Sequence, residues 1–201
     1  MPAQRDIILA SASPRRSDLL KQVGLEFRVL PSEVDEHLDE LVTPGRHVEI
    51  LAERKARAVA EMLEVRDSDG NPLIIAADTI VVLDDHLLEK PVNEEHALEM
   101  LKQLRGREHR VYSSLCVLEP KSDLMRLGRR CTHVVMDVHS DERLRAYVDS
   151  GEPMDKAGAY GIQGRGAVLV REIRGDYFNV VGLSLALLAE YLADFDVLIP
   201  G

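Results

Sequence analysis

The run Leu73-Ile74-Ile75-Ala76-Ala77 is unbroken and apolar, and it lies between a polar, proline-containing stretch at 67–72 and the pair Asp78-Thr79. A run this short and this apolar is typical of a strand that is covered on both faces. Residues 7–10 form a second run of the same kind. Because such strands need cover on each side, we expect helices on both faces of a sheet and predict an α/β protein.

The rest of the chain adds to both element types. Capping residues and apolar periodicity predict helices at 15–23 (closed by Gly24), 43–63, from Asn93 to Gly106, from Ser140 to about 150, and at 183–192. Further strands are predicted at 27–30, 80–83 with 87–88 as a hairpin, 111–118 paired with 131–138, and 167–173. We therefore predict a mixed sheet flanked by helices, forming one domain over 1–201 with two lobes around a central cleft.

Charge and composition narrow the possible partners. The chain has 201 residues and a net charge of −10, which argues against a surface that wraps nucleic acid. An acidic protein can still bind a triphosphate through a few converging cations or a divalent cation. The first residues are too brief for a signal peptide and no span approaches transmembrane length, so we expect no membrane association and a cytoplasmic location. Cys116 and Cys131 are expected to be small buried side chains.

Ser11-Ala12-Ser13-Pro14-Arg15-Arg16 lies between a predicted strand and the start of a predicted helix. Free N–H groups at a helix N-terminus attract anions, and two guanidinium groups add donors that fit phosphate oxygens. The alternative is that both arginines only face solvent. Cations in the first turn of a helix are slightly unfavourable, and this favours a phosphate-binding role for Arg15 and Arg16.

Asp78 and two lysines are the next candidates. A carboxylate directly after a buried strand is partly desolvated, so Asp78 is a candidate general base or metal ligand, or alternatively a turn or cap residue. Lys55 lies near the edge of the apolar stripe of the 43–63 helix, and Lys90 precedes Pro91 in an extended segment. Each lysine is also compatible with an ordinary surface position.

The segment 151–166 contains five glycines and little apolar periodicity, so we predict a long loop, which is usually functional. Within it, the amide of Gln163 offers a donor and an acceptor together. Such an amide matches the O4 acceptor and N3–H donor of uracil or thymine, whereas a Glu would suit the two donors of guanine. The alternative is a flexible loop without a binding role.

Other catalytic motifs are missing from the sequence. It contains no P-loop, no G-x-S-x-G elbow, no H-E-x-x-H and no paired cysteine spacing, so a dedicated zinc site is not expected.

Taken in chain order, these segments resemble the Maf family of nucleotide pyrophosphatases. The matching text is Leu9-Ala10-Ser11, Ser13-Pro14-Arg15-Arg16, Ser32-Glu33-Val34-Asp35-Glu36, Glu53-Arg54-Lys55-Ala56, Ala77-Asp78-Thr79-Ile80-Val81, Lys90-Pro91, 155–164 and Val181-Gly182-Leu183. It spans nearly the whole chain, and all of these pieces in this order are far more specific than any one of them.

The resemblance implies hydrolysis between the α and β phosphates of a nucleoside triphosphate, with a divalent cation, Mg²⁺ or Mn²⁺. It implies that Asp78 accepts the proton of water. The implied phosphate-binding residues are Ser11, Arg15, Arg16, Lys55 and Lys90; the implied metal ligands are Glu36 and Asp78; the implied base-selecting residues are Arg15, Thr79 and Gln163. The A-Y-G-I-Q-G text resembles the dTTP/UTP branch of the family, and homodimerisation is implied by the resemblance alone.

Two small departures affect the rim of the expected pocket. Tyr112-Ser113-Ser114 stands where many relatives have Thr-Gly, and Glu89 replaces a common Gly before Lys90. Two other functions stay open. One is the sister activity on 7-methyl-GTP, and the other is a non-catalytic, nucleotide-binding regulator of cell division, in keeping with the historical family name septum formation inhibitor.

Overall fold

The structure, a computed structural model, describes residues 5–38, 40–64 and 71–199. Its contacts divide the described residues into two compact units. Unit 1 takes residues from 1–78, 113–129 and 182–201, and unit 2 takes those of 79–112 and 130–181. The single domain over 1–201 stays a prediction. No helix of the described residues is both long and apolar enough to cross a membrane.

The strands form a mixed sheet in the order β2-β1-β3-β5-β6-β7, with β4 paired to β3. Their bounds are β1 Ile7–Leu9, β2 Arg28–Val29, β3 Leu73–Leu83, β4 His86–Leu88, β5 Glu108–Glu119, β6 Leu124–Met136 and β7 Val170–Arg174. Strand β1 is parallel to β2 and β3, whereas the pairs β3–β4 and β6–β7 are antiparallel. The α/β class and the mixed sheet are therefore confirmed.

The helices are α1 Pro14–Gln22, α2 Pro44–Glu64, α3 Glu94–Leu104, α4 Asp141–Val148, α5 Tyr177–Val181 and α6 Leu185–Ala193. Short 3₁₀ helices follow α4: η1 Glu152–Asp155, η2 Ala157–Ala159 and η3 Gly164–Leu169. Two predicted caps are confirmed, because Asn93 Oδ1 accepts the backbone N–H of His96 at 2.8 Å and Ser140 Oγ accepts that of Arg143 at 3.3 Å.

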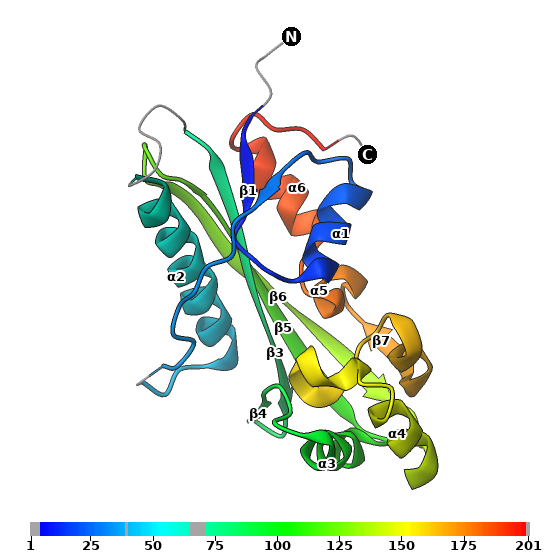
Figure 1. The fold of residues 1–201 in the computed structure, drawn as a ribbon. Coiled ribbons are helices and arrows are strands. Elements are labelled where there is room, and N and C mark those ends of the chain that lie inside the picture. The colour runs from blue at the N-terminus through cyan, green and yellow to red at the C-terminus, as the bar shows by residue number, and fades with distance from the viewer. Residues whose placement is uncertain (1–4, 39, 65–70, 200–201) are drawn as a thin grey trace. The chain divides into compact units, whose positions relative to one another are not determined.

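In unit 1, helix α2 covers one face of the strands, and α1 and α6 lie on the other (Figure 1). Ile8 and Ile74 belong to one core cluster together with α2 residues such as Ala56. The alternate strand residues Leu9 and Ile75 are also fully buried. Since successive side chains of a strand point to opposite faces, these strands are covered on both sides, as their sequences predict.

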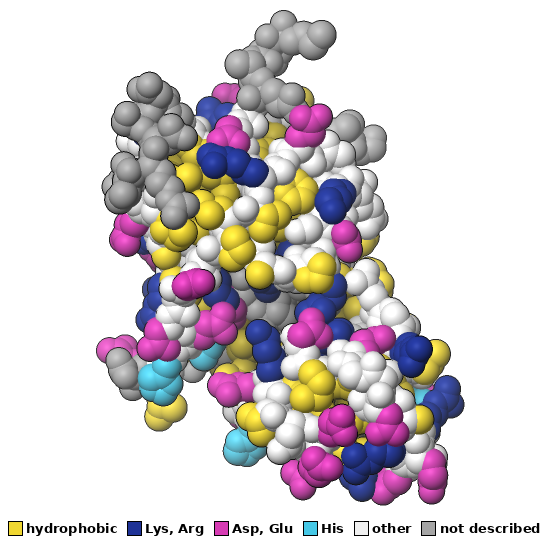
Figure 2. Space-filling view, viewed as in Figure 1, with side chains coloured by type: hydrophobic (Ala, Val, Ile, Leu, Met, Phe, Trp, Pro, Cys, Tyr) yellow, Lys and Arg dark blue, Asp and Glu magenta, His cyan; other side chains and the backbone are white. Residues whose placement is uncertain are grey.

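Unit 2 has its own apolar core, built from β3 residues such as Val81, from α3, from α4 and from the 3₁₀ segment. Helices α3 and α4 pack against each other (Figure 1). The visible faces of both units in Figure 2 carry acidic and basic side chains interspersed. The described residues on those faces form no broad basic surface.

Several predicted boundaries are wrong. Strand β3 does not end at Asp78-Thr79 but continues to Leu83, because Ile80 to Leu83 are as apolar as the residues before the polar pair. Strand β6 begins at Leu124 rather than at Cys131, and Cys131 itself is exposed. The predicted strand at 167–173 starts only at Val170, and the helix α5 was not predicted.

The segment 151–166 is not a loop without secondary structure, since η1, η2 and the start of η3 occupy most of it. Its glycines remove the apolar periodicity from which helices are read in a sequence. Short 3₁₀ turns need less periodicity, because they are held by hydrogen bonds one turn at a time.

Candidate active site

Asp78 lies in the middle of β3 and is only 6% exposed. Lys55 Nζ donates to its Oδ1 at 2.6 Å. Helix α2 points Lys55 at the strands because Ala52, Ala56 and Val59 on the same helical face pack against the sheet. Lys55 is buried as a result. The surface interpretation of Lys55 and the turn or cap interpretation of Asp78 are both wrong.

Glu36 approaches the same ammonium group from the segment between β2 and α2. Its Oε1 lies 2.6 Å from Lys55 Nζ, although the Glu36 side chain is 56% exposed. Asp78 Oδ1 lies at the same distance, 2.6 Å, from this nitrogen, so the two carboxylate oxygens are no farther apart than the sum of the two distances. One buried cation thus bridges two carboxylates, of which one is fixed in a strand and one is open to solvent.

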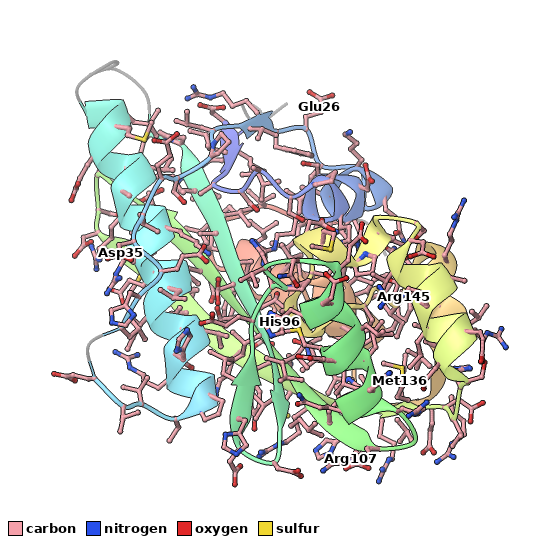
Figure 3. The ribbon with its side chains drawn as sticks, turned by 60° about the horizontal axis from the view of Figure 1, so that its bottom comes forward. Glu26, Asp35, His96, Arg107, Met136 and Arg145 are labelled. Carbon is pink, nitrogen blue, oxygen red and sulfur yellow. The ribbon has the colours of Figure 1, made fainter. Side chains whose placement is uncertain are left out.

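Arg54 anchors the segment that carries Glu36. Its Nη1 donates to the carbonyl oxygen of Asp35 at 2.5 Å and to that of His37 at 3.1 Å. Figure 3 shows Asp35 beside α2, from which Arg54 extends. The carbonyl groups on either side of Glu36 are therefore bound to the helix that also positions Lys55.

Ser11 organises the turn that leads into α1. Its buried Oγ accepts the backbone N–H of Ser13 at 3.2 Å and Nη1 of Arg16 at 3.1 Å. Arg16 Nε also donates to the carbonyl oxygen of Gly182 at 3.0 Å. Ser13 occupies the predicted N-cap position, but its side chain makes no capping hydrogen bond. The turn instead depends on Ser11, and it holds the Arg16 guanidinium in one place.

Burial and three neighbouring charged side chains act on the Arg16 guanidinium. Burial lowers the pKa of Arg16 from its ordinary value; the negative charge of Asp78 opposes this shift, the neighbouring Arg15 adds to it, and Glu36 opposes it. The attraction of the two carboxylates therefore does not fully offset the loss of hydration around this half-buried guanidinium.

Six of the predicted residues therefore lie together in unit 1. We name this group the unit 1 cluster; it consists of Ser11, Arg15, Arg16, Glu36, Lys55 and Asp78. The other three belong to unit 2: Thr79 follows Asp78 along β3 and is half-buried, while Lys90 and Gln163 are exposed. Gln163 is the N-cap residue of η3.

Comparison with known proteins shows the family of the chain. The family model described as "Maf-like protein" matches residues 6–195. The chain belongs to the Maf family. Among curated members, the dTTP/UTP pyrophosphatase of Pelotomaculum thermopropionicum is 47% identical over 95% of this chain and 97% of its own length. That of Desulforamulus reducens is 48% identical over 96% and 98%, respectively.

A solved structure, that of the Staphylococcus aureus Ham1 protein, covers 83% of this chain and 80% of its own with a TM-score of 0.47 and 16% identity.

The carboxylates of this Maf-family chain fit part of a divalent-cation site. Among the described residues no group of three or more His, Cys, Asp and Glu side chains is arranged to hold a metal ion. Magnesium, however, is usually bound through one or two carboxylates together with phosphate oxygens and water. Asp78 and Glu36, which converge on one point, supply that number of carboxylates.

Sequence reasoning gave no role to Arg54, Tyr147 or Glu152, although the structure shows that each of them hydrogen-bonds to main-chain groups. Arg54 stands inside the Glu53-Arg54-Lys55-Ala56 text, and its position beside Lys55 was the available signal. Tyr147 and Glu152 in unit 2 gave no signal, because neither belongs to a recognisable motif.

Proposed function

We propose that this protein hydrolyses the bond between the α and β phosphates of dTTP and UTP, releasing the monophosphate and pyrophosphate. The observation that carries the proposal is the unit 1 cluster, in which one buried ammonium joins two carboxylates beside two arginines. The curated relatives named dTTP/UTP pyrophosphatase support the substrate class.

In this proposal Arg15, Arg16 and Lys55 of the unit 1 cluster bind phosphate oxygens, a role that family likeness also gives to Lys90. Asp78 is the general base: the water oxygen forms a bond to phosphorus, the bridging P–O bond breaks, and the water proton passes to the Asp78 carboxylate. The buried position of Asp78 keeps bulk water from competing for that proton.

A divalent cation, Mg²⁺ or Mn²⁺, would supply charge neutralisation of the phosphates and a more acidic water when bound. Asp78 and Glu36 are the residues that would hold it. The unit 1 cluster has three cationic side chains and two carboxylates, so its net positive charge is small. It is too small to balance the negative charge of a triphosphate, and a divalent cation would add the positive charge that is needed. Glu36, the more exposed carboxylate, is the one that can turn away from Lys55 with least cost.

Base selection in this proposal belongs to Gln163, with Arg15 and Thr79 assigned by family likeness. The Gln163 amide can accept from N3–H and donate to O4 of uracil or thymine. A site built on such a pair rejects bases that leave its polar groups unpaired. The exposure of the Gln163 side chain is consistent with binding a ligand from solvent.

The test is a panel of dTTP, UTP, CTP, GTP and 7-methyl-GTP, assayed for pyrophosphate release with and without EDTA. We expect release from dTTP and UTP that EDTA abolishes. Preference for 7-methyl-GTP would instead assign the sister activity. Binding of nucleotide without any turnover would favour a non-catalytic regulator of cell division.

We further propose a cytoplasmic location and a homodimer, with no nucleic-acid partner. The net charge of −10 supports the last point, because it opposes binding to a polyanion. Cell fractionation and sedimentation equilibrium would test the location and the oligomeric state; recovery of the protein as a monomer would contradict the homodimer.

A further inference from the structure

The Glu152 carboxylate in unit 2 binds main-chain groups with both of its oxygens. Oε2 accepts the backbone N–H of Arg165 at 3.0 Å, and Oε1 accepts that of Gly166, also at 3.0 Å. The hydroxyl of Tyr147 donates to Oε1 at 3.1 Å. Three donors thus converge on one half-buried carboxylate, and two of them come from the main chain just after Gln163.

Tyr147 extends the same network to the other side of Gln163. Its hydroxyl oxygen accepts the backbone N–H of Gly161 at 3.1 Å while donating to Glu152. The main chain is therefore held at Gly161, two residues before Gln163, and at Arg165, two residues after it. Gln163 itself lies between these anchors with an exposed side chain.

Gly164 and Gly166 allow the main chain after Gln163 to pack closely against Glu152 and Tyr147. Gly164 has a φ of +65°, and a Cβ built on it would lie 2.8 Å from Glu152 Oε2. A Cβ on Gly166 would lie 2.3 Å from the carbonyl oxygen of Gly161 and 2.6 Å from the Tyr147 hydroxyl oxygen. Only glycine allows the main chain to approach Glu152 and Tyr147 this closely.

The charge state of Glu152 agrees with this geometry. Burial opposes ionisation, but hydrogen bonds from the N–H groups of Arg165 and Gly166 and from Tyr147 outweigh it, so the pKa of Glu152 is lowered from its ordinary value. The carboxylate is therefore ionised at neutral pH, and its hydrogen bonds are of the stronger, charge-assisted kind.

We infer that Glu152, together with Tyr147, is a positioning residue for nucleobase selection, because it fixes the main chain on both sides of Gln163. The inference rests on the proposed function and goes beyond it: Glu152 touches no substrate and acts only through Gln163. Loss of the carboxylate lets the Gln163 amide take several orientations, so base recognition weakens while the unit 1 cluster keeps its geometry.

The first test is Glu152→Gln. We expect the KM for dTTP to rise about tenfold, kcat to change less than about threefold, and the preference for dTTP over GTP to fall about tenfold. Glu99→Gln, an exposed carboxylate on α3, is the matched control and should leave all three values unchanged. An unaltered dTTP/GTP preference in Glu152→Gln would overturn the inference.

A double-mutant cycle separates positioning from general damage. In the Gln163→Ala background, Glu152→Gln should cost no further selectivity, because the group that it positions is gone. Additive losses would overturn the inference. Tyr147→Phe removes one anchor by deleting a single hydroxyl, and it carries the same cycle if Glu152→Gln does not fold. If Glu152 and Tyr147 only stabilised the fold, their variants would lower the melting temperature equally in the wild-type and Gln163→Ala backgrounds. The losses of selectivity would then be additive.

The outcomes also separate this inference from the proposed function. A wild-type protein that shows no hydrolysis of dTTP contradicts the proposed function itself. A wild type that prefers dTTP, and loses the preference in Gln163→Ala but keeps it in both Glu152→Gln and Tyr147→Phe, contradicts only the role of Glu152.

Discussion

In unit 1 charged side chains bind one another, as Lys55 binds Asp78 and Glu36, whereas in unit 2 the Glu152 carboxylate binds the main chain of the segment around Gln163. Side-chain ion pairs can exchange partners when a phosphate or a cation arrives. Main-chain hydrogen bonds hold a shape. The comparison suggests that changes in unit 1 affect the chemical step, and changes in unit 2 affect the choice of base.

The largest effect is expected from Asp78→Asn. The amide keeps the size of the side chain and can accept from Lys55, but it cannot take a proton, so kcat should fall by about 10³-fold while nucleotide binding survives. Pyrophosphate release and equilibrium binding of dTTP measure the two. The control is Asp18→Asn, an exposed carboxylate on α1. Undiminished hydrolysis in Asp78→Asn would remove Asp78 from the mechanism.

Lys55→Met should lower the free energy of unfolding by roughly 3 kcal/mol, because it leaves the buried Asp78 carboxylate without its cation. In Lys55→Met/Asp78→Asn most of that loss should be recovered. Urea denaturation measures both, and Lys21→Met, which removes an exposed ammonium, should change little. Additive losses in the double variant would show that the two side chains are not coupled.

His109 gives unit 2 a pH-dependent stability. Burial lowers its pKa to about 4, and its Nε2 lies 2.6 Å from the hydroxyl oxygen of Tyr160. The unfolded chain takes up this proton below about pH 6.5 and the folded chain does so only near pH 4, so stability falls as the pH drops through that window, by roughly 3 kcal/mol at most. Urea denaturation at pH values from 7 to 4.5 gives the free energy of unfolding as a function of pH. This free energy should fall less steeply with decreasing pH in His109→Gln than in the wild type, whereas the exposed control His86→Gln should behave like the wild type.

Gln163→Glu should reduce the preference for dTTP over GTP by about tenfold, because a carboxylate accepts from guanine donors but cannot donate to O4. The comparison between units predicts that kcat for dTTP changes much less than KM. Steady-state kinetics with both nucleotides decide this. Selectivity equal to that of the wild type would count against base reading by Gln163.

The smallest effect is expected from Arg54→Met, which releases the carbonyl groups of Asp35 and His37 on either side of Glu36. We expect the half-saturating concentration of Mg²⁺ to rise about threefold, because Glu36 is less well placed. Arg57→Met is the control, since Arg57 pairs with Glu53 and Asp123 instead. Equal effects in both variants would assign the change to lost helix charge.

The sequence predicts those parts of the molecule that have a period or a cap. The short apolar strands, the caps of α3 and α4, and the face of α2 near Lys55 follow from periodicity and local hydrogen bonding. The predicted strand that begins at Leu73 ends too early, because the polar pair Asp78-Thr79 has the composition of a strand end. Only the neighbouring strands and the residues after the pair keep it extended.

The site was predictable only as a set of residues. Residue types and family likeness named Asp78, Lys55 and Glu36. The described residues of the segment that carries Glu36 form no helix or strand, so its approach to Lys55 depends on hydrogen bonds from Arg54 of α2. The contacts of Glu152 were beyond sequence reasoning for a similar reason. A single carboxylate among glycines has no pattern, and its partners are main-chain groups that every residue possesses.

The placement of Asp78 within β3 matters to anyone who wishes to redesign this protein. Strand β3 lies between β1 and β5 in the sheet, so the backbone that carries the proposed base cannot be shifted without rebuilding its neighbours. Substitutions intended to change the nucleotide preference are therefore better made outside β3, in the segments that carry the proposed ligand-binding residues Glu36 and Gln163. The reactive carboxylate is best treated as the fixed reference point around which such libraries are built.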